Sequence, residues 1–284
     1  MSGETCAPLS LTRAIEDYPI GNIPLKRHQM DALAAAGLEG KLSVHPHAWI
    51  SPADLIQLPT SHRTTLCDDA GEALAWIGDA PDMHSALQGA ASFLIRYPWD
   101  LLRANEQYVG ALSDDRIEGD VHPLAVIEGR IHLGKGSRIL PGVFIEGHVV
   151  IGENCKIGPN CYLRGNTSIG DKCHIGQSVE IKNCLILSGT NVGHLSYVGD
   201  SVLGEGVNFG AGTTTSNLRH DGGNHTSRVE GKLVDTGRRK FGTIVGDGVH
   251  TGINTSIYPG RKLWPKTSTL PGEIVRKDVL KSLF

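Results

Sequence analysis

Aliphatic side chains recur at every sixth position through the middle of this 284-residue sequence. The run comprises Ile127, Leu133, Ile139, Ile145, Ile151, Ile157, Leu163, Ile169, Ile175, Ile181 and Leu187. An α-helix repeats every 3.6 residues and an ordinary strand every two, so neither produces a period of six. A six-residue period is typical of a parallel β-helix, in which three short faces make a coil of about 18 residues. The sequence therefore predicts an all-β solenoid of hexapeptide repeats.

The other positions of the repeat predict how a coil is built. Small or β-branched residues stand two positions before most of these aliphatics, and we expect them to fill the narrow interior. They are Val143, Val149, Cys155, Cys161, Thr167, Cys173 and Val179. Glycine often follows the aliphatic residue, where we expect a corner with positive φ. Arg164 and Lys182 break that rule, and because they are one full coil apart we expect them to lie one above the other on the same edge.

Composition narrows the classes of function. A formal net charge of −3 provides no basic field for nucleic acid. The six cysteines form no Cys-x-x-Cys pair, and three share the interior position, so we expect reduced core thiols and a cytoplasmic protein. The N-terminus has no signal-peptide pattern, and no run approaches the roughly 18 apolar residues of a membrane span. We therefore expect neither a nucleic-acid nor a membrane partner.

Residues 1–112 have a different sequence pattern from the repeat, and they predict a small α/β domain before the solenoid of 113–284. A helix is expected over 25–36, closed by Gly37. Further helices are expected over 85–94 and from Pro98 to about 112. Short strands are expected near 41–45 and 73–77. This segment contains no glycine-rich phosphate loop, so we expect no independent chemistry in it.

The repeat is interrupted twice in the second half of the chain. It slips after Leu187, resumes at Leu203 and Phe209, and stops again from Gly210. A polar, basic stretch follows, and the period returns at Val245. The sequence predicts a long loop at about 213–242, and a loop of this length between regular coils is more often functional than accidental. A disordered insertion is the alternative.

His194 falls where the repeat first slips, close in sequence to Tyr197. A histidine near its unperturbed pKa of about 6.5 is the ordinary general base at neutral pH, although a lone histidine is more often structural. Stacked Arg164 and Lys182 would hold a phosphate through charge-assisted hydrogen bonds. These three side chains together favour catalysis on a phosphorylated substrate.

The loop supplies a second cationic surface. Its basic residues suit the phosphates of a nucleotide-like cofactor such as coenzyme A. Before the loop, Gly210, Ala211 and Gly212 would let a ligand chain run close to the backbone.

At these residues the sequence resembles a known family. The matching motifs are Val179-Glu-Ile-Lys182, Gly193-His-Leu-Ser-Tyr-Val-Gly-Asp200, Val207-Asn-Phe-Gly-Ala-Gly212 and Asn217-Leu-Arg219, with Gly237-Arg-Arg-Lys240 and Thr251-Gly-Ile-Asn254 beyond. They look like the acetyltransferase domain of the bifunctional glucosamine-1-phosphate N-acetyltransferase and N-acetylglucosamine-1-phosphate uridylyltransferase family, in its long-loop branch. That branch acetylates amino-sugar 1-phosphates, including galactosamine-1-phosphate. The resemblance covers about 113–280 and implies a left-handed β-helix.

The resemblance implies a role for each candidate residue. His194 would be the general base that deprotonates the sugar amine as it attacks the thioester of acetyl-CoA. Arg164 and Lys182 would bind the sugar 1-phosphate, with Tyr197 and Asn208 orienting the sugar. The residues that would contact acetyl-CoA are Gly210, Ala211, Gly212, Asn217 and Lys240. The family forms homotrimers in which a neighbouring subunit completes each site, and acetyl transfer there needs no metal.

Departures from the family pattern limit what the resemblance implies. Leu218 stands where the bacterial-type motif has Tyr, and Ile253 stands where it has Ser. The family's N-terminal Gly-x-Gly-Thr-Arg loop is missing, whereas 11–24 and 97–106 look like shortened echoes of that domain. We therefore expect a degenerate nucleotidyltransferase-like domain over 1–112, without uridylyl transfer.

The sequence thus predicts an amino-sugar-1-phosphate N-acetyltransferase that uses acetyl-CoA, with glucosamine-1-phosphate or galactosamine-1-phosphate as acceptor. Two alternatives remain: acetylation of a nucleotide-linked amino sugar, and a non-catalytic sugar-phosphate-binding scaffold. A zinc site is not expected, because His132, His148 and His174 fall at different phases of the repeat.

Overall fold

The computed structural model describes residues 3–59 and 63–282. Within them the chain divides into two compact units. The smaller unit comprises Arg13–Pro19 and Ile23–Asp100. The larger unit comprises the residues up to Thr12, Ile20–Asn22 and the chain from Leu101 onward. Helix α3 (Pro98–Gly110) begins in the smaller unit and continues in the larger one.

The smaller unit packs two helices with short strands. Helix α1 ends at Gly37 in the left-handed conformation (φ 67°), which confirms the helix and the cap expected from the sequence. The expected strands near 41–45 and 73–77 are β3 and β6 of a four-stranded sheet ordered β3-β6-β5-β7. The elements are η3 (Ile15–Asp17), β2 (Ile23–Pro24), α1 (Leu25–Ala36), β3 (Ser43–Val44), β4 (Ala48–Trp49), α2 (Pro52–Ile56), β5 (Thr65–Cys67), β6 (Ala73–Trp76), η4 (Met83–Ser85), β7 (Ala86–Gln88) and β8 (Phe93–Leu94). Strand β1 (Pro19–Ile20) pairs with β2, and η1 (Gly3–Cys6) and η2 (Leu9–Leu11) belong to the larger unit.

The prediction of a helix over 85–94 is wrong. The chain there forms β7, which pairs in parallel with β5, and β8, which pairs with β4. Between these strands the carboxylate of Asp54 accepts hydrogen bonds from the backbone amides of Ala90, Ala91 and Ser92. Strand pairing and this carboxylate satisfy the backbone groups, so tertiary contacts override the local helix propensity.

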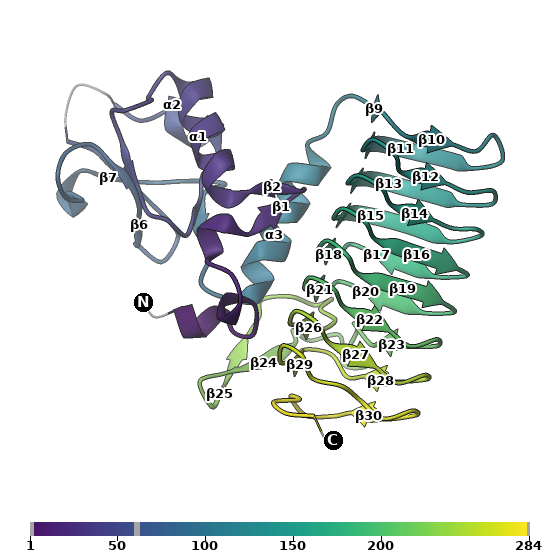
Figure 1. The fold of residues 1–284 in the computed structure, drawn as a ribbon. Coiled ribbons are helices and arrows are strands. Elements are labelled where there is room, and N and C mark those ends of the chain that lie inside the picture. Colours follow the sequence, from purple (N-terminus) through teal and green to yellow (C-terminus); the bar gives the residue numbers. More distant parts are fainter. Residues whose placement is uncertain (1–2, 60–62, 283–284) are drawn as a thin grey trace. The chain divides into compact units, whose positions relative to one another are not determined.

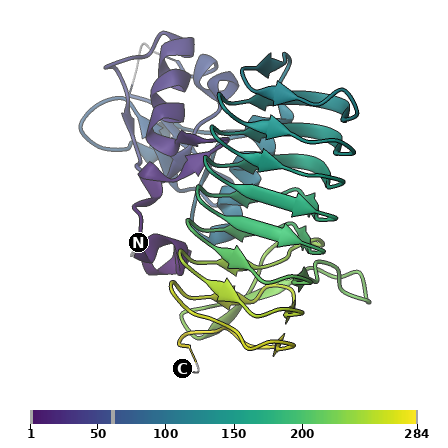
Figure 2. The ribbon, with the colours of Figure 1, turned by 45° about the vertical axis from the view of Figure 1, so that its right-hand side comes forward.

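The larger unit is the predicted parallel β-helix. Its coils follow one another along the chain in Figures 1 and 2 and form a seven-stranded and a thirteen-stranded sheet. Every residue of β11 pairs in parallel with its counterpart in β13, one coil further along the chain. The strands of the seven-stranded sheet are β10 (Asp120–Val121), β12 (Arg138–Ile139), β14 (Lys156–Ile157), β16 (His174–Gln177), β19 (Asn191–His194), β22 (Asn208–Phe209) and β27 (His250–Thr251).

The thirteen-stranded sheet completes each coil. Its strands are β9 (Arg116–Ile117), β11 (Val126–Leu133), β13 (Phe144–Ile151), β15 (Tyr162–Ile169), β17 (Glu180–Lys182), β18 (Leu185–Ile186), β20 (Tyr197–Gly199), β21 (Val202–Leu203), β23 (Thr214–Thr215), β26 (Ile244–Val245), β28 (Ser256–Ile257), β29 (Lys262–Leu263) and β30 (Ile274–Val275). The fold class expected from the sequence, a parallel β-helix of hexapeptide coils preceded by a small α/β unit, is confirmed.

The solenoid interior contains the residues that the repeat predicts. Ten of the eleven aliphatics at the sixth positions are buried, and Ile127 is partly buried against the same core. Cys155, Cys161, Cys173 and Cys184 are buried and free. These four cysteines are therefore reduced thiols of the core, and not part of the disulfide or zinc arrangements that six cysteines also permit.

The positive φ expected for the glycine after each aliphatic residue occurs at Gly158 (φ 98°) but not at Gly134, Gly152, Gly170 or Gly176. A Cβ atom built at Gly134 would lie 2.6 Å from the backbone of Gly152, and one at Gly176 would lie 1.8 Å from the carbonyl oxygen of Gly193. Glycine is therefore required by the close approach of the next coil. Apart from Gly158, positive φ occurs at other positions of the repeat, among them Asn154, Asn160, Lys172 and Ser178.

The slip of the repeat comes from one shortened corner. Arg164 pairs with Lys182 at the full coil length, whereas Lys182 pairs with Gly199, one residue short of a full coil. Asn183 alone turns the corner after Lys182, with φ 53°, and Asp200 alone turns the next corner, with φ 50°. Asn and Asp tolerate this left-handed backbone better than other side chains do. The shorter coils therefore bring two polar side chains to adjacent corners.

The corners at Asn183 and Asp200 belong to successive coils and form a corner column. The long loop is inserted at the next corner of this column. It forms an antiparallel hairpin of β24 (Thr226–Val229) and β25 (Lys232–Asp235), closed at its base by a bridge between Leu218 and Lys240. The amide of Gly242 then donates to the carbonyl of Asp200, and the solenoid resumes. The described residues of the loop are thus folded, in contrast to the alternative of a disordered insertion.

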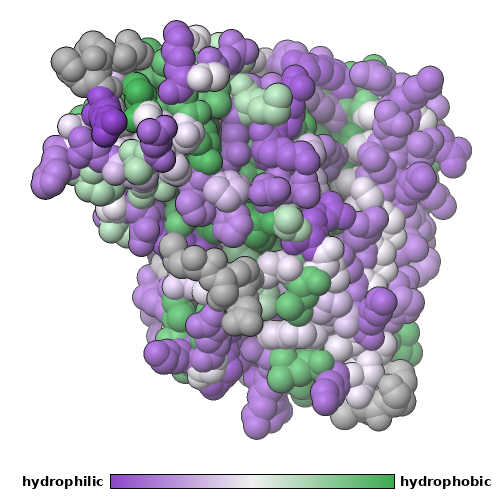
Figure 3. All heavy atoms as spheres, turned by 60° about the vertical axis from the view of Figure 1, so that its left-hand side comes forward, coloured by the Kyte–Doolittle hydropathy of each residue, from purple (hydrophilic) through white to green (hydrophobic). Residues whose placement is uncertain are grey.

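Over residues 3–59 and 63–282, no helix is both long enough and apolar enough to cross a bilayer. On the face drawn in Figure 3, hydrophobic residues form small patches separated by hydrophilic ones.

Candidate functional site

Arg164 and Lys182 lie on neighbouring strands, as their spacing predicts. Arg164 is in β15 and Lys182 is in β17, and the two residues are register partners. Both lie immediately before a corner, at the edge of the solenoid where the coils become one residue shorter. The repeat therefore brings two cationic side chains together on one edge.

Each of these cations is paired with a carboxylate. The guanidinium of Arg164 donates to Oε1 of Glu180 from Nε at 2.8 Å and from Nη2 at 2.6 Å, and this ion pair raises the pKa of Arg164. The ammonium of Lys182 lies 2.9 Å from Oδ2 of Asp200. The two pairs differ in exposure: Arg164 and Glu180 are 35% and 32% exposed, whereas Lys182 and Asp200 are 14% and 4% exposed.

Asp200 is the centre of a hydrogen-bonded cluster. Its Oδ2 accepts from Lys182 and from the side-chain amide of Asn217, and its Oδ1 accepts from Asn183 at 3.1 Å. Three donors thus converge on one buried carboxylate. Such charge-assisted bonds hold the three side chains in fixed positions.

Tyr197 joins this cluster through Asn217. The amide of Asn217 donates to the phenolic oxygen of Tyr197 at 2.9 Å. Burial raises the pKa of Tyr197, and the nearby charges of Asp200 and Glu180 raise it further. The hydroxyl therefore stays protonated at neutral pH. Since its oxygen already accepts from Asn217, its own proton is available for donation.

His194 lies in a second group of candidate residues. It ends β19 in the seven-stranded sheet, and its imidazole is exposed. The carbonyl oxygen of His194 accepts a hydrogen bond from the amide of Gly212. Asn208, in β22, is the register partner of Asn191 in β19. Within the residues that the structure describes, no hydrogen bond or ion pair joins this imidazole to the Asp200 cluster. His194, Asn208, Gly210, Ala211 and Gly212 thus form one group, and Arg164, Lys182, Tyr197 and Asn217 form another.

The long loop is fastened to Asn217. The backbone oxygen of Asn217 accepts from the amide of Phe241, and it lies 3.0 Å from Nε2 of His225, which therefore carries a proton. Burial lowers the pKa of His225, so its ring is neutral at neutral pH. Lys240 lies at the base of the loop, in the bridge with Leu218. This bridge places Lys240 next to the group that contains Asn217.

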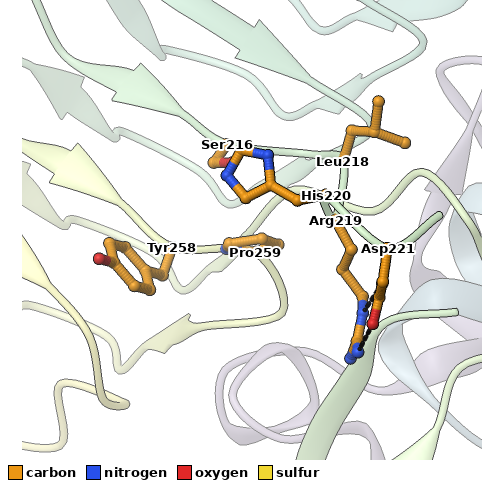
Figure 4. Close-up of a pocket in the computed structure, with 7 residues that line it drawn as sticks. All are labelled: Ser216, Leu218, Arg219, His220, Asp221, Tyr258 and Pro259. Carbon is orange, nitrogen blue, oxygen red and sulfur yellow. Dashed lines mark hydrogen bonds and ion pairs between the residues drawn. The ribbon is translucent and has the colours of Figure 1, made fainter. Parts of the chain in front are cut away.

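A cavity opens beside the base of the loop (Figure 4). It has a volume of about 570 Å³ and is lined by Ser216, Leu218, Arg219, His220, Asp221, Tyr258 and Pro259. Arg219 and Asp221 pair within it, and this pairing lowers the pKa of Asp221. The half-exposed side chains of Leu218 and Tyr258 give the cavity an apolar part beside the charged one. This mixture suits a ligand that carries both an aliphatic chain and a phosphate.

Asp200, Glu180 and His225 belong to the site, although the sequence does not predict them as site residues. Asp200 and Glu180 stand inside the motifs that carry the resemblance, and the spacing between Asn183 and Asp200, one residue short of a full coil, was the signal of a shortened corner. No pattern in the sequence pointed to His225. As for metals, the described parts of the chain hold no cluster of three or more His, Cys, Asp or Glu side chains suited to an ion.

Comparisons with known proteins match this part of the chain. The family model described as GMPPB C-terminal domain matches residues 145–267. The bifunctional sugar-1-phosphate nucleotidylyltransferase/acetyltransferase of Sulfurisphaera tokodaii is 42% identical over 182 residues, which are 64% of this chain and 45% of that protein. The bifunctional protein GlmU of Methanococcus aeolicus is 36% identical over 187 residues, which are 66% of this chain and 45% of that protein. The chain thus spans about half the length of these curated relatives.

Solved structures with similar coils include acyltransferases. The UDP-N-acetylglucosamine O-acyltransferase of Moraxella catarrhalis aligns over 53% of this chain and 66% of its own, at 12% identity and a TM-score of 0.33. The acetyltransferase domain of PglB from Neisseria gonorrhoeae aligns over 63% of this chain and 65% of its own, at 13% identity and a TM-score of 0.25. The sequence relatives confirm the resemblance seen in the motifs: the C-terminal part of this chain is similar to bifunctional sugar-1-phosphate nucleotidylyltransferase/acetyltransferases.

Proposed function

We propose that this protein is an amino-sugar-1-phosphate N-acetyltransferase, which transfers the acetyl group of acetyl-CoA to the amine of glucosamine-1-phosphate or galactosamine-1-phosphate. One observation carries the proposal. Lys182, stacked on Arg164, is bonded to Asp200, which also binds Asn217 and through it Tyr197, at the base of a folded loop. One relative of this chain is named a bifunctional sugar-1-phosphate nucleotidylyltransferase/acetyltransferase.

His194 is the proposed general base. Its exposed imidazole at the end of β19 is accessible to a substrate, as a base must be. It would remove a proton from the sugar amine as the nitrogen attacks the thioester carbon. The C–S bond then breaks, and the thiol of coenzyme A leaves with a proton.

Arg164 and Lys182 are the proposed phosphate ligands. Ion pairs with Glu180 and Asp200 hold these cations in place, so little side-chain freedom is lost when a phosphate binds beside them. The protonated hydroxyl of Tyr197 would donate to a sugar oxygen. The exposed amide of Asn208, in the group of His194, would also contact the sugar.

Acetyl-CoA is the proposed co-substrate. Gly210, Ala211 and Gly212 leave the backbone beside His194 accessible, while Asn217 and Lys240 stand at the base of the loop. The adjacent cavity of about 570 Å³ offers Arg219 to a phosphate. The proposed transfer is direct and needs no metal ion.

The two separate groups of site residues support a shared active site. Within one chain, the group of His194 and the group of Lys182 lie on different sheets. We propose that a homotrimer brings one group of each subunit to the other group of its neighbour. The buried free cysteines are in keeping with a reducing, cytoplasmic location.

An acceptor panel tests the proposed reaction. The release of free thiol from acetyl-CoA should depend on glucosamine-1-phosphate or galactosamine-1-phosphate, and should be weaker with the unphosphorylated amino sugars. A faster reaction with a nucleotide-linked amino sugar would replace the proposed acceptor. Binding of the sugar phosphates without thiol release would instead indicate a sugar-phosphate-binding scaffold. No pyrophosphate release from UTP and N-acetylglucosamine-1-phosphate is expected, because the N-terminal segment lacks a phosphate-cradling loop.

A further inference from the structure

Glu106, outside the repeat, is tied to the candidate site. It lies near the end of α3, and its carboxylate faces the corner column of the solenoid and the long loop. Both oxygens accept from the guanidinium of Arg238, with Nη1 at 3.1 Å from Oε2 and Nη2 against Oε1. Oε1 also accepts from the side-chain amide of Asn183 at 2.6 Å.

Helix α3 holds Glu106 in a fixed place. The preceding residue, Asn105, is fully buried and accepts from the hydroxyl of Ser168 at 2.7 Å, while its own amide donates to the carbonyl of Asn166. The side chain of Asn166 in turn donates to the backbone oxygen of Glu106 at 3.3 Å. The helix end is thus bonded to the corner of β15, immediately beyond Arg164.

The contacts of Glu106 continue to the Asp200 cluster. Asn183 has two amide protons, of which one goes to Glu106 and the other to Asp200. Asp200 holds Lys182 and Asn217. A continuous chain of hydrogen bonds therefore runs from the loop residue Arg238 to the proposed phosphate ligand.

The charges of this chain are balanced. Two cations, Arg238 and Lys182, face two carboxylates, Glu106 and Asp200, and all four are at most 26% exposed. Without the charge of Glu106, the guanidinium of Arg238 would lose its partner and would compete with Lys182 for Asp200. Since an unpaired buried charge is costly, the loop would shift to relieve it.

We propose that Glu106 is a positioning residue of the acetyl-transfer site: it anchors the long loop through Arg238 and keeps Asp200 for Lys182 and Asn217. This inference rests on the proposed function for its catalytic consequence. The helix before the solenoid thereby takes part in the site, although the sequence indicated no chemistry in residues 1–112.

Steady-state kinetics of Glu106→Gln test the proposal. The variant keeps the size and removes the charge, so the KM for acetyl-CoA should rise about tenfold, as expected for the loss of a charge-assisted hydrogen bond, with a smaller change in kcat. Glu118→Gln, at an exposed glutamate of the same unit, should leave both constants unchanged. A double variant with Arg238→Gln should raise KM no further than Glu106→Gln alone, because the two side chains act as one unit.

Hydrogen exchange of the substrate-free protein provides a readout that does not depend on activity. In Glu106→Gln, the backbone amides of β24 and β25 should exchange faster, while those of β13 should not change. If the wild type releases no thiol with any acceptor, the proposed function fails, and hairpin exchange alone decides whether Glu106 anchors the loop. Unchanged hairpin exchange, or an active Glu106→Gln with wild-type KM, would overturn the inference.

Discussion

Burial decides which of the two ion pairs at the site matters for stability. Lys182 and Asp200 are 14% and 4% exposed, so removal of one charge leaves the other buried without compensation. Arg164 and Glu180 are each about one third exposed, and an exposed pair contributes roughly 0–1 kcal/mol. The two ion pairs are therefore expected to contribute unequally to the free energy of unfolding, although their cations are stacked in register.

Paired variants measure this difference. Asp200→Asn keeps the left-handed backbone at φ 50°, and it should lower the free energy of unfolding by about 3 kcal/mol. Glu180→Gln should lower it by less than about 1 kcal/mol. Urea denaturation of both variants checks the values. Equal losses would mean that Asp200 does not hold a buried cation.

His225 predicts a pH dependence of the loop. Burial lowers its pKa in the folded protein, so the neutral ring contributes stability at pH values above the unfolded pKa of about 6.5. That contribution is lost as the pH falls below about 6.5, because protonation favours the opened loop. The protection factors of the β24 and β25 amides, which are corrected for the slower intrinsic exchange at lower pH, should therefore fall between pH 7 and pH 5. His225→Gln should remove most of this change, and an identical pH response in that variant would exclude the imidazole as its source.

At the scale of elements, the period of six predicted the coils well because it records which side chains enter the interior. The period of six did not predict the residues of the candidate site equally well. The interior residues of a solenoid must be aliphatic, whereas the corner residues Asn183 and Asp200 are chosen by backbone conformation and by partners far along the chain. The contact of Glu106 with Arg238 spans 132 residues and leaves no periodic trace.

Two corner glycines separate the cost of a left-handed backbone from the cost of losing a contact with the loop. Gly260 and Gly272 have φ 71° and 73°, so alanine at either site should cost about 1 kcal/mol in conformation. A Cβ atom at Gly260 would also lie 2.5 Å from the carbonyl oxygen of Thr226 in β24, whereas one at Gly272 would contact nothing within 4 Å.

Alanine at these two positions should therefore behave differently. Gly260→Ala should lose roughly 1–3 kcal/mol more stability than Gly272→Ala and should accelerate hydrogen exchange in the hairpin. Gly272→Ala should leave hairpin exchange unchanged. Thermal unfolding and exchange mass spectrometry of both variants would check this, and equal behaviour would show that the hairpin does not pack on Gly260.

In the whole molecule, the proposed active site needs more than one chain. The groups of His194 and Lys182 lie on different sheets of one solenoid, and in the proposed homotrimer a neighbouring subunit supplies the second group. Light scattering at micromolar concentration should give a mass near three times the 30.4 kDa of the chain. A monomer that transfers acetyl groups at full rate would contradict the shared site.

The rate of acceptor-dependent thiol release from acetyl-CoA, in the wild type and in His194→Ala, tests the central claim most directly. With an amino-sugar 1-phosphate as acceptor, the wild type should turn over, and His194→Ala should lower kcat by roughly 10²–10⁴-fold with little change in the KM for acetyl-CoA. His148→Ala, which changes a histidine on β13 of the same solenoid, should retain wild-type rates. Full activity in His194→Ala, or a wild type that releases no thiol with any amino-sugar phosphate, would contradict the account.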